Sequence, residues 1–231
     1  MIDASSFATL HNAFWAEHAP TSEHFVRRLN LEYTERWSPP IDKPREKIRA
    51  AFVSEFAFAR FCGRASGLDP SQLDTAAFTE TKKRLIPLMD DSKELDLPLS
   101  LIEKNQVKHL EESLVGFFGR RGKELYIRPI FKGCGYVDSS EADVISGSCL
   151  FEIKAVDRPF RSVDIKQLVT YYALNHASRQ FDLESIGIFN PRRSVWFEMN
   201  FDEVSREISG QSAQELCDNV VLAVSSGDIS R

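Results

Sequence analysis

Hydrophobic residues in the first hundred positions recur three and four residues apart, which is the spacing of one face of a helix. The stretches with this spacing run from Phe7 to Trp15, from Thr21 to Tyr33 and from Pro44 to Gly63. Proline-containing segments separate them, as expected where helices end. Residues 67–98 are rich in Asp, Pro and Leu, which is typical of short helices and connections. We therefore expect a helical N-terminal region over residues 1–98.

From residue 99 onward the pattern is mixed, with short apolar or alternating runs between helical stretches. The expected elements are, in chain order, a helix over Leu101–Phe118, strands over Glu124–Phe131, Ala142–Ile145 and Cys149–Val156, a helix over Ser162–His176, strands over Ser185–Phe189 and Ser194–Met199, and a helical region over Asp202–Val224. This order describes a compact α+β domain over residues 99–231, with the helical region attached to it.

The composition is that of an ordinary globular protein. Of the 231 residues, 42% are hydrophobic and 27% are charged, and the formal net charge of −5 is not that of a protein that coats nucleic acid through a uniformly basic surface. No apolar run approaches the roughly 18 residues that a membrane span needs, and the N-terminus lacks a signal-peptide pattern, so we expect a cytoplasmic protein without membrane partners. The four cysteines show no CxxC spacing, which favours buried free thiols over disulfides or a zinc site.

The segment from Asp143 to Lys154 is the most informative part of the chain. In a strand over Cys149–Val156, the period of two places Glu152 and Lys154 on one face. Two charged groups in an otherwise apolar strand cost several kcal/mol if they are desolvated without compensation. The short turn before this strand allows a hairpin that brings Asp143 across from Glu152. Two carboxylates beside a lysine are an oxygen-rich site for Mg²⁺ or Mn²⁺. The alternative is a solvated face of an edge strand.

The order of these residues matches a known pattern. The residues that carry it are Asp143, Glu152-Ile153-Lys154 nine positions later, and Gln167 and Tyr171 on the next expected helix. This arrangement resembles the PD-(D/E)XK nuclease superfamily, and within it the RecB-like branch with a Q-x-x-x-Y motif. The resemblance covers about Leu101 to Met199. Ala142 stands where the family usually has a proline, a departure that removes no ligand.

The resemblance implies a restriction-endonuclease-like α-β-β-β-α-β core with a C-terminal helix, and it implies roles for the motif residues. Asp143, Glu152 and the main-chain carbonyl of Ile153 would bind Mg²⁺ or Mn²⁺. Lys154 would orient the attacking water and stabilise charge on the phosphate, which is the chemistry that a cation beside a metal site supplies. Gln167 and Tyr171 would support the water, the lysine and the nucleic-acid backbone. Taken alone, this last pair fits a helix packing surface equally well.

Many RecB-like proteins add a glutamate from the helix before the first strand. On a helical wheel at about 100° per residue, Glu111 falls within the apolar arc of this helix and Glu112 points away, so Glu111 is the expected further metal ligand. The alternative for Glu111 is a surface partner of Lys108. Glu55, on an earlier helix, is expected to be a paired helix residue or an acid that supports the site indirectly.

Basic residues are concentrated near these motifs. Residues 120–193 contain 12 basic and 9 acidic residues, an excess of +3, so the rest of the chain carries −8. A local basic excess is what a phosphate-binding face requires. The arginines expected to contact the nucleic-acid backbone, with ordinary loop arginines as the alternative, are Arg158, Arg161, Arg192 and Arg193.

These observations favour a metal-dependent nuclease that hydrolyses phosphodiester bonds, with DNA as the expected substrate. Because the chain shows no base-reading module, we expect a protein partner or a homo-oligomer, as in a phage-defence or mobile-element system. One alternative is a catalytically inactive nuclease-like module that binds nucleic acid or assembles with other proteins. Another is an RNase, because a metal site that acts on the phosphate does not itself distinguish RNA from DNA.

Overall fold

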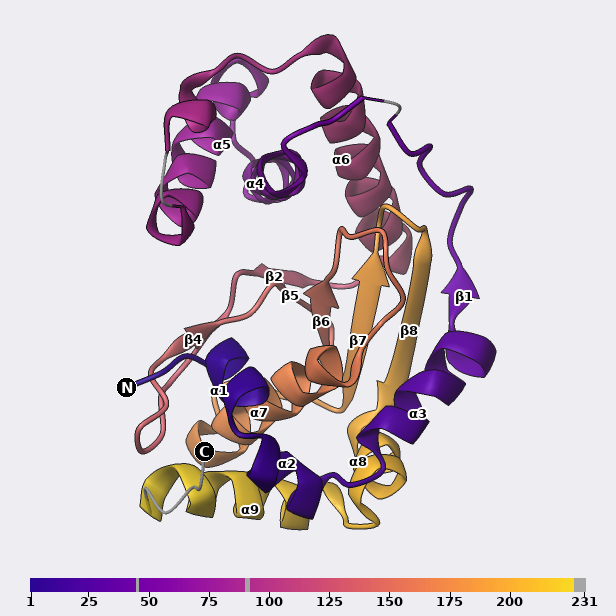
Figure 1. Cartoon of the computed structure of the whole chain (residues 1–231), viewed down its shortest axis with the longest axis vertical. Helices are drawn as coiled ribbons and strands as arrows, with labels where there is room; N and C mark the ends of the chain where they lie inside the picture. The colour runs from indigo at the N-terminus through magenta and orange to yellow at the C-terminus, as the bar shows by residue number, and fades with distance from the viewer. Residues whose placement is uncertain (45, 90–91, 227–231) are drawn as a thin grey trace.

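A mixed six-stranded sheet lies at the centre of the computed structural model, which describes residues 1–44, 46–89 and 92–226 (Figure 1). The strands are, in their order across the sheet, β1 (Glu35–Arg36), β8 (Val195–Asn200), β7 (Ser185–Asn190), β6 (Cys149–Ile153), β5 (Val144–Ser146) and β2 (Leu125–Ile127). Strands β6 and β7 pair in parallel, and the other neighbours pair antiparallel. Strands β3 (Ile130–Phe131) and β4 (Ser140–Glu141) form a separate two-stranded sheet.

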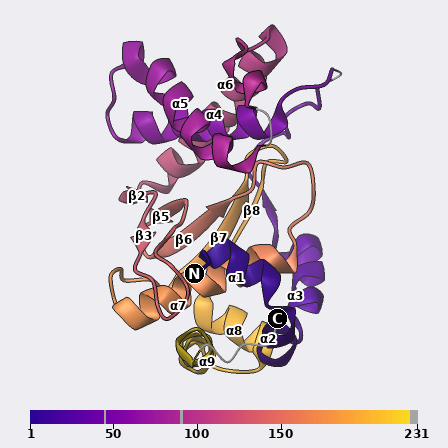
Figure 2. The same ribbon diagram turned by 60° about the vertical axis from the view of Figure 1, so that its left-hand side comes forward.

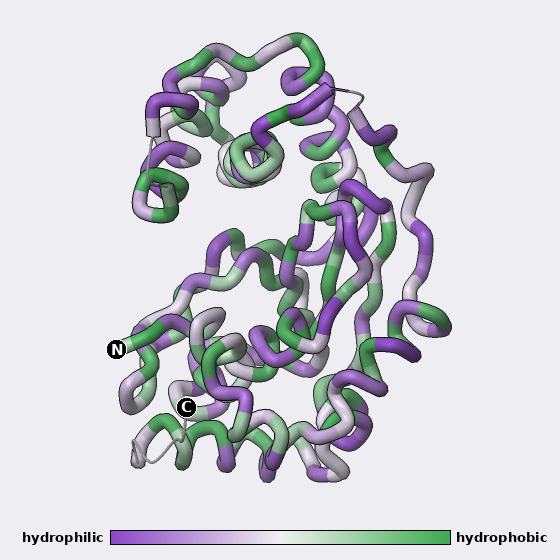
Figure 3. The backbone as a smooth tube through the Cα atoms, viewed as in Figure 1, coloured by the Kyte–Doolittle hydropathy of each residue, from purple (hydrophilic) through white to green (hydrophobic). Residues whose placement is uncertain are grey.

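One face of the sheet is covered by helices from both ends of the chain. These helices are α1 (Ala4–Leu10), α2 (Asn12–His18), α3 (Ser22–Arg28), α7 (Ser162–Ser178), α8 (Phe201–Ser209) and α9 (Ala213–Ser226). They contribute to one hydrophobic cluster together with the inward side chains of β5 to β8. Figure 3 shows hydrophobic and hydrophilic positions alternating along α9, as expected for a helix with one buried face. We call this part of the molecule the sheet body.

The remaining helices lie beyond one end of the strands. Helices α4 (Ala50–Ala65), α5 (Pro70–Leu85) and the first half of α6 (Leu101–Arg121) share a second hydrophobic cluster and form what we call the helical lobe (Figures 1 and 2). Two short 3₁₀ helices, Ile86–Leu88 and Lys93–Asp96, connect α5 to α6. The second half of α6 packs Phe117 and Phe118 against Phe151 and Phe189 of the sheet.

The expected α+β class is confirmed, but the grouping of elements differs from the expected one. Helices α1 to α3 share the hydrophobic cluster of the sheet body, whereas the start of α6, beyond residue 98, shares the cluster of the helical lobe. The expected boundary between residues 98 and 99 therefore does not separate the residues of the two hydrophobic clusters. Helical spacing predicts which face of a helix is buried, but it does not show which partner covers that face.

Several element bounds also differ, for local reasons. The strand expected over Glu124–Phe131 is broken into β2 and β3, because Arg128 has a φ of +53° and Pro129 has no N–H to donate. The last helical region is divided into α8 and α9 at Gly210, which has a φ of +73° and ends α8. The short edge strand β1 was not expected.

The expected hairpin is confirmed. Strands β5 and β6 pair antiparallel, with Ser146 opposite Cys149 and Val144 opposite Phe151. The turn consists of Gly147 and Ser148, and Gly147 has a φ of +62°, which glycine adopts without a steric penalty. Continued by one position, this register places Asp143 opposite Glu152.

Candidate active site

Strand β6 divides its side chains between two environments. Phe151 and Ile153 belong to the hydrophobic cluster shared with α4 and α6. Glu152, on the other face, is 6% exposed, and the Lys154 side chain that follows the strand reaches residues of α7. The predicted sidedness is therefore confirmed, and the alternative of a solvated edge strand is excluded, because β6 pairs with both β5 and β7.

Asp143 is held at the open end of the hairpin by its own backbone and by its side chain. Its Oδ2 accepts a hydrogen bond from the Ile153 N–H at 2.7 Å, and its main-chain carbonyl accepts one from the Arg128 N–H at 2.9 Å. Burial raises the pKa of Asp143 well above its usual value, and the nearby charge of Glu152 raises it further. The two carboxylates therefore repel each other, which is the electrostatic condition that a bound cation relieves.

Lys154 lies among polar groups that hold its ammonium group in place. Its Nζ donates to Glu152 Oε1 at 2.8 Å and to Gln167 Oε1 at 3.0 Å, and it lies 3.8 Å from Asp164 Oδ1. Burial is the largest single influence and would lower the pKa of Lys154, but the charge and hydrogen bond of Glu152, together with the charges of Asp164 and Asp143, outweigh it, and the net pKa lies above its usual value. Lys154 is therefore a fixed positive charge next to the two carboxylates.

Helix α7 orients this lysine through a chain of hydrogen bonds. Gln167 Nε2 donates to Tyr171 Oη at 3.1 Å, and the Tyr171 hydroxyl donates to the carbonyl of Glu141 at 2.9 Å. The direction of these bonds leaves the Gln167 carbonyl oxygen free to accept from Lys154. Burial raises the pKa of Tyr171, so its hydroxyl stays protonated and remains a donor. Gln167 thus contacts Lys154 directly and Tyr171 orients Gln167, so this pair is not only a packing surface.

The oxygen donors at this site fit Mg²⁺ or Mn²⁺. The described part of the chain has no group of three or more His, Cys, Asp and Glu side chains placed to hold a metal ion. Mg²⁺ does not need such a group, because it binds through one or two carboxylates and keeps several waters. Asp143 and Glu152, with the Ile153 carbonyl between Glu152 and Lys154 in the chain, provide a set of this kind, and the mutual repulsion of the two carboxylates favours a cation.

Glu111 does not lie at this site. Its side chain is 3% exposed and forms ion pairs with Arg60, at 2.6 Å, and with Arg64, both on α4. These three residues line a separate cavity of about 820 Å³ between the helices of the helical lobe. This placement corrects the expectation that Glu111 joins the metal ligands, because the face of α6 that carries Glu111 packs against α4.

Glu55, on α4, is a helix glutamate that does lie beside Asp143. The two residues line the same cavity, and the charge of Glu55 contributes to the raised pKa of Asp143. Glu55 Oε1 forms ion pairs with Arg128 at 3.1 Å and with Arg84 at 3.4 Å. Because the Arg128 backbone N–H donates to the Asp143 carbonyl, Glu55 supports the position of Asp143 through Arg128.

The four arginines expected to contact a nucleic-acid backbone fall into different environments. Arg158 forms two hydrogen bonds, of 2.8 and 2.9 Å, with the buried carboxylate of Asp164, so its guanidinium is already committed to a structural partner. Arg161 is exposed, and its backbone N–H donates to Asp164. Arg192 is 9% exposed, whereas Arg193 is partly exposed, and both line the cavity beside Asp143.

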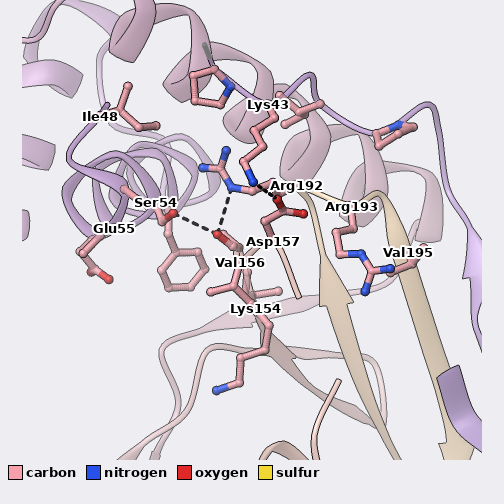
Figure 4. Close-up of a pocket in the computed structure, with 18 of the residues that line it drawn as sticks. Lys43, Ile48, Ser54, Glu55, Lys154, Val156, Asp157, Arg192, Arg193 and Val195 are labelled. Carbon is pink, nitrogen blue, oxygen red and sulfur yellow. Dashed lines mark hydrogen bonds and ion pairs between the residues drawn. The ribbon is translucent and has the colours of Figure 1, made fainter. Parts of the chain in front are cut away.

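This cavity lies between the helical lobe and the end of β6 and has a volume of about 960 Å³ (Figure 4). Asp143, Ile153 and Lys154 line one end of it. Ser54 Oγ, on α4, donates to the Ala155 carbonyl at 3.2 Å, which ties the helical lobe to the chain just after Lys154. The cavity therefore gives solvent access to Asp143, whereas Glu152 does not line it.

Several residues of this region could not be identified from the sequence. Arg36 and Lys43 line the cavity, but they precede the segment that carries the motifs and belong to a stretch with no regular spacing. Asp164 stands one turn before Gln167, and this spacing on α7 is the available signal that it approaches Lys154. The cysteines are free, but only Cys149 and Cys217 are buried.

No protein-family model matches the chain, and no curated protein matches it in sequence. Among the described residues, no helix combines the length and the apolar character that crossing a membrane requires. The functional assignment therefore depends on the chemistry of the site itself.

Proposed function

We propose that this protein is a metal-dependent nuclease that hydrolyses phosphodiester bonds in DNA. The observation that carries the proposal is the arrangement of Asp143 opposite Glu152 in one hairpin, with Lys154 bound to Glu152 and to Gln167 of α7. With β3 and β4 of the separate small sheet left aside, the order α6, β2, β5, β6, α7, β7, with β7 parallel to β6, is consistent with the α-β-β-β-α-β core that the resemblance to PD-(D/E)XK nucleases implies.

The residues of the site have separate tasks in this proposal. Asp143, Glu152 and the Ile153 carbonyl would hold Mg²⁺ or Mn²⁺, which supplies positive charge to polarise the phosphate and its attacking water. Lys154 places a second positive charge beside the phosphate and orients the water, because Glu152 and Gln167 fix its ammonium group. Tyr171 keeps the Gln167 amide in the orientation that accepts from Lys154.

The test is cleavage by the full-length protein of linear, circular and single-stranded DNA and of RNA, with Mg²⁺, Mn²⁺ or EDTA. We expect DNA cleavage that requires the divalent ion. Asp143→Asn and Lys154→Ala should each reduce the cleavage rate by at least about 100-fold, which is the scale of losing one charge from a preorganised site. Glu112→Gln, on the exposed face of α6, is the matched control and should cleave like the wild type.

The alternative outcomes are distinct. Cleavage of RNA alone would replace the substrate but keep the chemistry. Absence of cleavage under all these conditions would contradict the proposal. In that case Mn²⁺ should also fail to raise the melting temperature, as expected for a module that only binds nucleic acid or assembles with other proteins. A Mn²⁺-dependent increase in melting temperature that Asp143→Asn abolishes would instead show that the hairpin binds the metal.

A further inference from the structure

The turn between β7 and β8 buries an arginine whose hydrogen bonds are incomplete. Arg192 Nε donates to the Ala155 carbonyl at 3.3 Å, and Nη1 donates to Gln106 Oε1 at 2.7 Å. Arg192 Nη2 is also buried, but it has no hydrogen-bond partner among the described residues. A buried donor without an acceptor is unfavourable, so this position calls for an acceptor from outside the described protein.

No carboxylate forms an ion pair with Arg192 within the described part of the chain. The negative charge that acts on it is that of Asp157, whose carboxylate is paired with Lys43 at 3.2 Å. Both partners of that pair are more than half exposed, so the pair is weak and can open. The described lining of the cavity carries five basic and four acidic residues, although the whole chain has a net charge of −5. An anion is therefore the acceptor that this environment favours.

The Arg192 guanidinium contacts the segment that directly follows the hairpin. Arg192 binds the carbonyl of Ala155, which directly follows Lys154. Figure 4 shows the ammonium group of Lys154 at the bottom of the view and the guanidinium of Arg192 above it, near Lys43 and Asp157. One cavity therefore presents two separated positive groups, and a nucleic-acid strand carries a regular series of phosphates that can meet both.

We propose that Arg192, with Lys43 at its rim, forms a phosphate-binding subsite that takes a second phosphate of the nucleic-acid strand cut at Asp143 and Lys154. This inference rests on the proposed nuclease function. The phosphate oxygen would accept from Arg192 Nη2 and displace Asp157 from Lys43. The shared chemistry is a phosphate group, which comes either from the end of a strand or from its interior.

The test measures binding without cleavage, with the full-length protein in EDTA. Fluorescence anisotropy with a short 3′-labelled oligothymidylate, with and without a 5′-phosphate, gives the affinity, and inorganic phosphate serves as competitor. We expect Arg192→Gln to weaken binding at least about tenfold, because it removes a charge-assisted hydrogen bond. Lys43→Gln should weaken binding about two- to threefold and flatten the dependence on salt. Arg206→Gln, an exposed arginine on α8, is the matched control.

The two sources of phosphate give different results. If the wild type binds the 5′-phosphorylated strand about tenfold more tightly and Arg192→Gln abolishes this preference, the subsite takes a terminal phosphate. If Arg192→Gln weakens the binding of both strands equally, the subsite takes an internal phosphate. If Arg192→Gln does not fold, the affinity of Lys43→Gln tests the subsite, because Lys43 is exposed and its substitution should not disturb folding. Wild-type affinity in the folded variants, together with metal-dependent cleavage, overturns the subsite alone. Absence of cleavage in the wild type overturns the proposed function. The anisotropy results do not depend on cleavage, because binding is measured in EDTA.

Discussion

The helical lobe and the sheet body each hold a carboxylate in place with hydrogen bonds, but the two carboxylates are compensated to different degrees. In the helical lobe, Glu103 accepts three hydrogen bonds from Arg49 and one from the Ser100 N–H, and these bonds lower its pKa to about 2. In the sheet body, Asp143 accepts one described hydrogen bond, from Ile153, and its pKa is raised by burial and by Glu152. The first carboxylate stabilises the fold, and the second is left able to bind a ligand.

The largest expected effect on stability concerns the compensated pair. Glu103→Gln leaves the Arg49 guanidinium, whose side chain is 16% exposed, without its counter-charge. Removal of one partner from a buried pair is strongly destabilising, so we expect the free energy of unfolding to fall by roughly 3 kcal/mol, measured by urea denaturation. Glu112→Gln on the same helix removes only a surface pair with Lys108 and should change it by less than about 0.5 kcal/mol. Equal effects of the two substitutions would contradict the comparison.

The same pair predicts how this difference depends on pH. The pKa of Glu103 is lowered from 4.5 in the unfolded chain to about 2 in the folded protein, so its contribution is complete above the first value and is lost as the pH falls through the second. The stability difference between wild type and Glu103→Gln should therefore shrink between neutral pH and about pH 3. A difference that grows on acidification would have the wrong sign.

A smaller effect is expected for Glu111→Gln. Glu111 pairs with Arg60 and with Arg64, and the side chain of Arg64 is half exposed, so solvent screens part of the interaction. We expect a loss of about 1–2 kcal/mol in the free energy of unfolding. Metal-dependent cleavage should persist at the wild-type rate, measured below the new melting temperature. Loss of Mn²⁺ binding in this variant would instead show that Glu111 is a metal ligand.

The smallest expected change in stability is that of Asp143→Asn, and its sign is opposite. The substitution removes the repulsion between Asp143 and Glu152, and the new amide oxygen can still accept from the Ile153 N–H. In EDTA we expect the free energy of unfolding to be unchanged or higher by up to about 1 kcal/mol, as is common where a site is kept for function. Marked destabilisation by this substitution would make Asp143 a structural residue like Glu103.

The sequence predicted the parts of the site that depend on local periodicity. The alternation in β6 separates Glu152 from Phe151, and the four-residue spacing on α7 places Gln167 beside Tyr171, because both relations follow from one element alone. The wheel favoured Glu111 over Glu112, but whether Glu111 lies near Asp143 depends on what its face of α6 packs against, which is α4. A helical wheel contains no such information, since an apolar arc faces a neighbour without identifying it.

For the same reason, the environment of Arg192 in the cavity could not be predicted from the sequence. Arg192 and Arg158 both follow strands and have similar surroundings in sequence, yet Arg158 is paired with Asp164 and Arg192 has one nitrogen without a partner. Long-range contacts determine this difference: Gln106 and Ala155 come from distant parts of the chain. The edge strand β1, which brings Arg36 to the cavity, contains only two residues and leaves no periodic signal.

The packing of α1 to α3 onto the sheet body also has a consequence for biosynthesis. The Ala4 N–H donates to Ser140 Oγ, 136 positions away, and the Thr21 hydroxyl donates to the Glu207 carbonyl, 186 positions away. During synthesis the N-terminal helices can therefore complete these contacts only after α8 has been made, whereas the contiguous helices α4 and α5 can pack as soon as they emerge. The hairpin itself is local, but its partners α7 and β7 follow it in the chain, so the candidate site is assembled only after residue 190 has been made.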